Sequence, residues 1–516
     1  MVAMDRHETP RYNHQLYVYY ITKRNHDYWK NKKVPFEKPY PILGNYGDYI
    51  LLKNFFGNVT KRLCEKFPES PYVGTFYGTE PALVVQDPDL IRLILVKDFF
   101  YFHGREVCKY VDREITTQSI FFTYGDDWRV LRHSLTPLFT TSKMKNMFHL
   151  IKNCCRVFEN VLEEKATVKS FEINSIIKYF IMDCVGACLF GVEINAMEKH
   201  SQNPIVKISK EIFPKSTTRG IINVLRGIWP SLFYALRLKL FPEVITMFFT
   251  DLLECAFKDR QRNLSQRQDF IDLFMKLRQI KYLVGDSIRI IKNGRVQKVN
   301  LGVTDELLIA QCVSFLGAAF ETPSTTLSTT FYDLAKNPKY QKRAIESDDN
   351  YFASNMNEIE FDSRIDDAAC RLLSDETLRL LPSLANLTRE VMEDYTFPTG
   401  LKVEKGTRIH IPVYHLQRNP KYFPEPNKFD PRRFLPEAKQ TIYPFTYMPF
   451  GEGHRMCIAM RFAKMQMLAG FATLLKKYEV AVDDTTPQEL TIDPRIIVTT
   501  PIENIQLKLI ARQHAL

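Results

Sequence analysis

Residues 447–467 read YMPFGEGHRMCIAMRFAKMQM, and this stretch decides how the rest of the chain is interpreted. A loop interrupted by Gly451 and Gly453 leads to Cys457, and an apolar pattern with helical spacing follows the cysteine. The two glycines allow backbone angles that let the loop curl beneath a flat ligand. A helix N-terminus favours the thiolate, which is the nucleophilic and metal-binding form of cysteine. The alternative for a lone cysteine is a buried structural role.

Composition places the chain among large globular proteins of a reducing compartment. It has 516 residues with 45% hydrophobic content, enough for one large core or several smaller ones. Its ten cysteines form no CxxC pair and show no pairing rhythm, which argues against a zinc or disulfide framework. The formal net charge of +11 indicates an acidic partner or an anionic surface. Because the positive residues are spread along the chain, we expect no nucleic-acid partner.

The N-terminal residues have only a short apolar run. Residues 1–15 are polar and charged, and the apolar run covers residues 16–21 alone. A membrane-spanning helix needs roughly 18 or more apolar residues, and no signal-peptide core is present. The closely spaced prolines of residues 34–41 then predict a stiff, extended segment.

Hydrophobic periodicity predicts a mainly α fold with a smaller β-rich part. The expected helical regions are residues 50–67, 87–96, 126–190, 200–262 and a long helix over 304–335. The expected strands are a hairpin over residues 71–86 that turns at Gly78, short runs within 385–436, and segments 495–500 and 505–510.

The long predicted helix carries an acid beside a hydroxyl, Glu321 and Thr322. Pro323 removes the N–H that would bond to the carbonyl of Ala319, at a cost of about 3 kcal/mol in a helix interior. An acid and a hydroxyl at an opened helical turn suit proton delivery. The alternative for Thr322 is a hydrogen bond within its own helix.

Two further helical segments place charged side chains on one face. Glu376 and Arg379 are three residues apart, so their side chains are neighbours, although an exposed pair of this kind contributes only about 0–1 kcal/mol. Trp128 and Arg132 are four residues apart, and an arginine suits a carboxylate ligand.

The spacing Phe-x-x-Gly-x-Arg-x-Cys from Phe450 to Cys457, followed by a helix, resembles the haem-ligand loop of the cytochrome P450 superfamily. The other motifs occur in the family's order, so the resemblance covers residues 35–510. It implies the cytochrome P450 fold and haem b, with Cys457 as the ligand of the iron and Phe450 beside the haem. Thiolate donation of this kind favours cleavage of the O–O bond.

The resemblance also assigns roles to the charged motifs. Trp128, Arg132, Arg389 and Arg455 would bind the haem propionates, and the alternative for Arg389 is a solvated loop charge. A structural network of Glu376, Arg379 and Arg433 would support the cysteine loop. Arg432 stands where many relatives have glutamate, so we expect an electrostatically less favourable corner there.

By the same resemblance Thr322 would hydrogen-bond dioxygen and Glu321 would help relay protons. The chain departs from the family's pattern at several nearby positions. Ala319 and Ala459 replace glycines, Pro323 replaces a small polar residue, and His454 and Met456 replace Pro and Asn.

Residues 285–289 and 304–311 resemble the insect microsomal group that metabolises foreign compounds. The resemblance implies a monooxygenase that inserts one oxygen atom from O2 into lipophilic substrates, either xenobiotics such as plant allochemicals or insecticides, or endogenous lipids and hormones. Electrons would come from NADPH through NADPH–cytochrome P450 reductase, with cytochrome b5 as a further partner. The alternatives are a haem-thiolate isomerase or lyase that needs no reductase, and a non-catalytic haem-binding protein.

The resemblance further implies a location on the cytoplasmic face of the endoplasmic reticulum membrane. Residues 1–34 would form an N-terminal segment with a truncated or atypical anchor, and residues 35–516 a single catalytic domain. Residues 221–249 either dip into the membrane surface or form core helices over the substrate cavity. A basic face for an acidic redox partner, or an ordinary solvated face, would consist of Arg129, Arg132, His133, Lys143, Lys145, Arg461 and Lys464.

Overall fold

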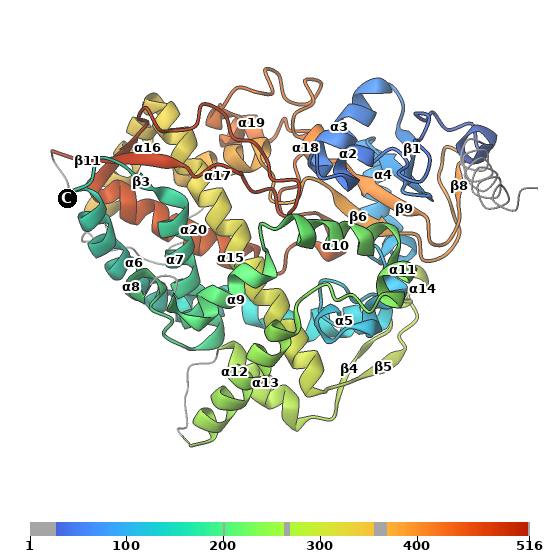
Figure 1. The fold of residues 1–516 in the computed structure, drawn as a ribbon, viewed down its shortest axis with the longest axis horizontal. Helices are drawn as coiled ribbons and strands as arrows, with labels where there is room; N and C mark the ends of the chain where they lie inside the picture. The colour runs from blue at the N-terminus through green and yellow to red at the C-terminus, as the bar shows by residue number, and fades with distance from the viewer. Residues whose placement is uncertain (1–26, 200–201, 263–268, 355–368, 514–516) are drawn as a thin grey trace, which may run out of the picture.

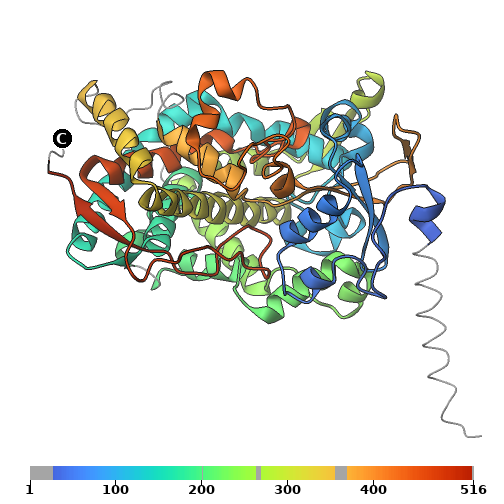
Figure 2. The ribbon, with the colours of Figure 1, turned by 90° about the horizontal axis from the view of Figure 1, so that it is seen from above.

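The central element of the fold is α15, Asp305–Lys336, which runs through the middle of the molecule (Figures 1 and 2). The computed structural model describes residues 27–199, 202–262, 269–354 and 369–513, so the apolar run at 16–21 lies outside the described residues. Thr304 begins α15 by accepting a hydrogen bond from the N–H of Leu307 at 3.2 Å. The predicted long helix is therefore confirmed, and it stays continuous across Pro323.

Helices pack around α15 on most sides. Its main partners are α7 (Ile173–Val185), α17 (Ala369–Leu380) and α20 (Met460–Lys477). The other described helices are α2 (Gly47–Ile50), α3 (Phe56–Lys66), α4 (Pro88–Arg92), α5 (Gly125–Leu135), α6 (Thr141–Lys165), α8 (Ala196–Lys199), α9 (Pro204–Ile212), α10 (Thr217–Ile228), α11 (Pro230–Ala235), α12 (Glu243–Arg262), α13 (Phe270–Gln279), α14 (Ile290–Asn293), α16 (Pro338–Ser354), α18 (Val413–Leu416) and α19 (Pro436–Lys439).

Most of the β structure lies at one end of the molecule, and one smaller sheet lies at the opposite end (Figure 1). Its largest sheet has the order β1 (Tyr72–Tyr77), β2 (Glu80–Val85), β9 (Arg408–Ile411) and β6 (Leu387–Glu390), with β2 and β9 parallel. The predicted hairpin is confirmed, and Gly78 at its turn has a φ of +65°. Smaller sheets join β10 (Tyr478–Ala481), β11 (Gln506–Ala511) and β3 (Phe171–Glu172), and pair β7 (Tyr395–Thr396) with β8 (Lys402–Val403).

Three local predictions differ from the structure. Residues 495–500 form no strand, because Arg495 turns back to pair with Asp493. The expected helix over 50–67 is divided into α2 and α3, since Leu52 between them has a φ of +54°. An unexpected hairpin of β4 (Tyr282–Asp286) and β5 (Lys298–Gly302) covers α5.

Two described segments are long and apolar enough to cross a membrane, Ile173–Phe190 and Asp305–Lys336. Both are mostly buried: 72% of the apolar stretch of the first and 78% of that of the second lie inside the protein. They therefore serve as core helices of this fold.

Candidate active site

The loop before Cys457 folds back on itself through two left-handed glycines. Gly451 and Gly453 have φ values of +72° and +71°, and the N–H of Cys457 donates to the carbonyl of Phe450 at 2.8 Å. A Cβ on Gly453 would lie 2.0 Å from the carbonyl oxygen of Leu95. The glycine at 453 is thus required both by its backbone angle and by the close approach of another segment.

Cys457 combines an exposed side chain with a position deep in the protein. Burial raises the pKa of its thiol, while the N–H of Ala459 and the charges of Arg132 and Arg105 lower it, and the net shift is upward. The N–H of Ala459, directly before α20 begins at Met460, favours the thiolate, but burial of the thiol outweighs it. A thiolate at this position needs a stronger positive partner, and a bound metal ion supplies one.

Four buried or half-buried arginines gather beside Cys457: Arg105, Arg132, Arg389 and Arg455. No carboxylate among the described residues lies within ion-pair distance of any of them. Burial and the neighbouring guanidinium groups hold the pKa of Arg455 well below its usual range. Burial, with Arg105 close by, lowers the pKa of Arg389 to about 9.

This arginine cluster leaves hydrogen-bond donors unused. The Nε atoms of Arg105, Arg389 and Arg455 are buried and have no hydrogen-bond partner in the part of the chain that the structure describes. The guanidinium of Arg455 lies over the ring of Trp128 at 4.7 Å from the ring centre. Unpaired buried cations are costly, so this arrangement calls for an anionic ligand, and two carboxylates suit it.

Arg105 was not identified from the sequence. It follows His103 and Gly104 in a loop, and its guanidinium lies 3.8 Å from the centre of the Phe121 ring. A single arginine in a loop carries no recognisable spacing signal. The alternative for Arg389, a solvated loop charge, is wrong because this residue is only 3% exposed.

Glu376 and Arg379 form a fully buried ion pair. Arg379 donates from Nε and Nη2 to the two carboxylate oxygens of Glu376, at 2.7 and 2.9 Å. It also donates to the carbonyls of Gln417 and Pro426, each at 2.8 Å. Arg433 lies farther away, with its Nε at 3.7 Å from Glu376.

This network connects to the cysteine loop through Gln417. Its side chain donates to the carbonyl of Leu378 on α17 and accepts from the N–H of Met448, each at 2.9 Å. Tyr447 donates to the carbonyl of Asp375 at 2.9 Å. The start of the 447–467 stretch is therefore fastened to α17.

The expected unfavourable corner at Arg432 is wrong. Arg432 turns outward and donates to both carboxylate oxygens of Asp430, at 2.7 and 2.6 Å. Asp430 in turn donates its backbone N–H to Glu376 at 2.8 Å. The extra cation is thus neutralised locally.

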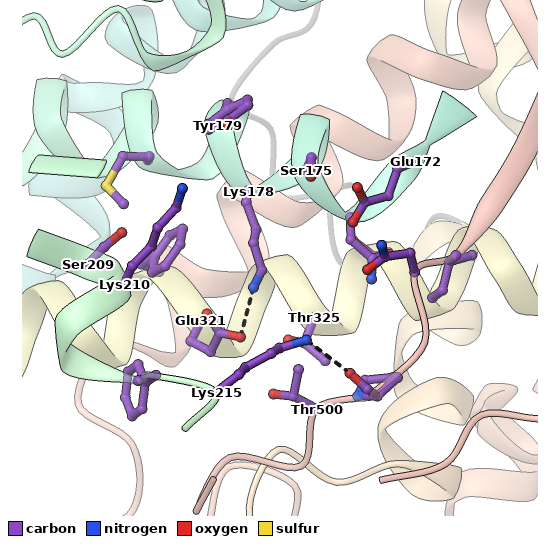
Figure 3. A pocket seen from close by; sticks show the side chains of 18 of the residues that line it. Glu172, Ser175, Lys178, Tyr179, Ser209, Lys210, Lys215, Glu321, Thr325 and Thr500 are labelled. Atoms are coloured by element: carbon purple, nitrogen blue, oxygen red, sulfur yellow. Dashed lines mark hydrogen bonds and ion pairs between the residues drawn. The ribbon is translucent and has the colours of Figure 1, made fainter. Parts of the chain in front are cut away.

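On the opposite side, α15 uses most of its own polar groups internally. Glu321 is buried and forms an ion pair with Lys178 on α7 at 3.0 Å, as Figure 3 shows. Thr322 Oγ1 donates to the carbonyl of Ala318 at 2.8 Å, which is the within-helix alternative. The Ala319 carbonyl, which Pro323 leaves without its usual N–H, accepts from Gln466 Nε2 at 3.3 Å.

Some basic side chains near the cysteine loop point into the protein, and others are exposed to solvent. Arg132 points inward and donates to the carbonyl of Met456 at 2.9 Å. Arg461 donates to Thr141 Oγ1 at 2.8 Å, which joins the start of α20 to the start of α6. His133 and Lys145 are exposed. An exposed basic surface therefore lies beside the cysteine loop.

The accessible thiol and the unpaired arginines fit one flat ligand with a thiol-seeking metal and two carboxylates, which is the description of haem b. This site defines a haem-thiolate protein. The family model described as Cytochrome P450 matches residues 34–509. The chain belongs to the cytochrome P450 family.

Several insect proteins are similar to the chain over nearly its whole length. "Cytochrome P450 6B2" of Helicoverpa armigera is 31% identical over 498 residues, which cover 96% of this chain and 96% of that protein. "Cytochrome P450 6j1" of Blattella germanica is 34% identical over 487 residues, 93% of this chain and 92% of that protein. "Probable cytochrome P450 6a14" of Drosophila melanogaster is 32% identical over 489 residues, 93% and 94% of the two chains. The chain is a haem-dependent P450 monooxygenase.

Proposed function

We propose that the protein oxidises lipophilic small molecules with electrons from NADPH, and that Cys457 holds the haem iron. The observation that carries this proposal is the accessible Cys457 thiol beside four arginines that pair with no carboxylate of the described residues. Haem bound there supplies the iron at which dioxygen is activated. The substrate class includes xenobiotics such as plant allochemicals or insecticides, and endogenous lipids or hormones.

The chain's own groups divide the remaining tasks. Arg105, Arg132, Arg389 and Arg455 bind the two propionates, and the Trp128 ring supports Arg455. Phe450 holds the N–H of Cys457 through its carbonyl, which fixes the direction of the thiol. The network of Glu376, Arg379 and Arg433 has a structural role: it supports the cysteine loop through α17 and is not catalytic.

Proton delivery in this proposal requires a rearrangement of α15. Glu321 must exchange Lys178 for water or for the Thr322 hydroxyl before it passes a proton onward. The Thr322 hydroxyl must likewise leave the Ala318 carbonyl to donate to the oxygen substrate. Both changes are side-chain rotations, so they do not require α15 to unfold.

Electrons would enter from NADPH–cytochrome P450 reductase, with cytochrome b5 as a second donor, on the exposed basic surface beside the cysteine loop. Its exposed members are His133, Lys145 and Arg461. Positive charge of this kind steers an acidic partner and raises its association rate. Charge reversal of Lys145 and Arg461 should raise the KM for reductase and leave the haem spectrum unchanged.

A location on the endoplasmic reticulum membrane is supported by exposed apolar side chains around α10 to α12. They are Ile221, Leu232, Leu236, Val244 and Met247, each between 48% and 62% exposed. Scattered apolar residues are normal on a surface, but a group on adjoining helices marks an interaction site. Replacing Leu236 and Met247 with serine should reduce flotation with phospholipid vesicles while the haem content stays constant.

Turnover under oxygen-18-labelled dioxygen tests the proposed function directly. The purified holoenzyme would be supplied with NADPH, reductase and a lipophilic compound chosen by its effect on the Soret band. We expect a product that contains one labelled oxygen atom and forms only with NADPH. Unlabelled product formed from an organic peroxide without NADPH would instead indicate an isomerase or lyase. No product from any compound that changes the Soret band would indicate a non-catalytic haem protein.

A further inference from the structure

A cavity of about 360 Å³ lies on the side of α15 that carries Glu321 (Figure 3). It is lined by residues of α7, α9, α15 and the segment before β11, and none of its lining residues belongs to the cysteine loop or the arginine cluster. Its volume is within the range of small-molecule sites in proteins, about 300–1,000 Å³. The cavity is therefore large enough for a ligand of its own.

Two of the α15 hydroxyls that line this cavity, those of Thr325 and Thr329, differ from most other hydroxyls of the helix. Ser324, Thr326, Ser328 and Thr330 all donate to the carbonyl four residues earlier, at 2.8–2.9 Å. Thr325 and Thr329, which line the cavity, leave their buried Oγ1 atoms without a partner, as does Thr500 across from them. All three residues are at least nine-tenths buried. A buried hydroxyl is normally hydrogen-bonded, so these three point to a ligand.

Cations outnumber anions around the cavity. Its lining includes the three lysines Lys178, Lys210 and Lys215 against the two glutamates Glu172 and Glu321. Among the described residues, the Lys215 ammonium donates only to the carbonyl of Pro501, at 3.4 Å, and burial together with Lys178 lowers its pKa. An anion in the cavity could therefore bind the Lys215 ammonium group and the three threonine hydroxyls. None of these four groups pairs with a carboxylate among the described residues.

The remainder of the lining is apolar, with Met182, Val206, Phe213, Phe320 and Ile505. We propose that this cavity binds a small amphipathic carboxylate, whose anionic group contacts Lys215, Thr329 and Thr500 and whose hydrocarbon part lies against the apolar wall. The site is separate from the haem site and is an effector site, not a substrate site.

The ligand would act on Glu321 through Lys178. The Lys178 ammonium now pairs with Glu321 at 3.0 Å, and a carboxylate in the cavity competes for that ammonium and repels Glu321. Loss of the Glu321 charge, which leaves the Lys178 ammonium without its carboxylate, should therefore tighten carboxylate binding. An effect of the ligand on turnover, through Glu321, rests on the proposed proton delivery. Binding of the ligand does not, because it is measured without turnover.

Octanoate binding to the holoenzyme, measured by calorimetry, tests this site. Saturating phenylimidazole would occupy the haem pocket, so that octanoate is excluded from it. We expect Lys215→Met to weaken binding by about tenfold or more, because a hydrogen bond to a charged group is lost. Thr329→Val should weaken it by about threefold or more for a lost hydroxyl donor. Glu321→Gln should tighten it several-fold.

Matched controls decide the interpretation. Lys207→Met changes a lysine on α9 outside the cavity, and Thr330→Val removes a hydroxyl that already bonds within the helix. Both should bind octanoate like the parent protein. Equal binding of octanoate by the Lys215→Met protein, equal binding of neutral octanamide by the parent, or loss of octanoate binding in phenylimidazole would each overturn the proposal.

Discussion

The cysteine loop and the Glu321–Thr322 segment of α15 are organised in opposite ways. The cysteine loop is held from outside by segments far away in the sequence, such as Gln417 on Met448 and Leu95 over Gly453. The reactive groups of the α15 segment are instead already paired, Glu321 with Lys178 of α7 and Thr322 with the Ala318 carbonyl of its own helix.

The difference is that the cysteine loop region is preorganised for its ligand, whereas the α15 segment must rearrange before it can act. The arginines near Cys457 keep unpaired donors, so that region is ready to bind an anionic cofactor without rearrangement. The proton-carrying groups on α15 are paired and must be released first. We therefore expect substitutions around the loop to affect haem binding and stability, and substitutions of Glu321 to affect turnover while haem content stays normal.

The largest effect should come from Arg379→Ala. Removal of one partner from a fully buried ion pair costs about 3–5 kcal/mol, a large part of the stability of an ordinary protein. The variant should accumulate little haem-loaded protein and unfold at a lower denaturant concentration. Arg432→Ala is the matched control, since its partner Asp430 lies at the surface side of the same network. If both variants unfold alike, the buried pair does not support the loop.

A smaller effect is expected from Gly453→Ala compared with Gly451→Ala. Both glycines have nearly the same positive φ, which costs an alanine about 1–2 kcal/mol. Only at 453 does the added Cβ also collide with the Leu95 carbonyl, whereas at 451 the nearest atom is 3.8 Å away. Haem content per protein, measured from the Soret absorbance, should fall sharply for Gly453→Ala and little for Gly451→Ala. Equal losses would show that the close approach of Leu95 is unimportant.

On the α15 side, Glu321→Gln should slow turnover by about a hundredfold or more while haem content stays normal, because the relay loses its acid. Lys178→Met should slow it far less, since the acid remains and only its partner is removed. The measurement is the rate of product formation per haem at saturating substrate, NADPH and reductase. Equal slowing by the two variants would mean that the ion pair itself, and not the free acid, is needed.

The smallest effect concerns Asp333, where α15 meets α17 and hydrogen-bonds Thr377. Burial, opposed by that hydrogen bond, raises the pKa of Asp333 to about 7 from an ordinary value of 3.8. A raised acid pKa means that the native state loses stability as the pH rises from about 4 to about 7. Asp333→Asn should thus gain about 1–2 kcal/mol at pH 8, with allowance for partial exposure, and nothing near pH 4. A pH-independent gain would contradict the titration of Asp333.

Local sequence signals predicted the elements well. The apolar pattern from Thr304 identified α15, Gly78 identified the β1–β2 turn, and Asp87 identified the start of α4, where it accepts from the N–H groups of Asp89 and Leu90. Each of these features depends on residues within a few positions of one another. The β4–β5 hairpin was missed because its two strands are joined through α14 and not through a short turn.

The partners of the site residues could not be predicted, because tertiary packing brings them together. Lys178 and Glu321 are 143 residues apart, and Gln417 and Met448 are 31 residues apart. Arg105 has no motif of its own, so only its position beside Arg389 and Arg455 identifies it. The family pattern at Cys457 indicated the cofactor, but it contained no information on the groups that pair with Glu321 and Thr322.

The spectrum of Cys457→Ala tests the central claim most directly. We expect the variant to lose the shifted Soret band that the reduced carbon monoxide complex of a haem-thiolate protein shows, because no thiolate remains to bind the iron. Cys108→Ala, which changes a buried cysteine near the arginine cluster, should keep that band. A normal shifted band in the Cys457→Ala protein would contradict the assignment of Cys457 as the haem ligand.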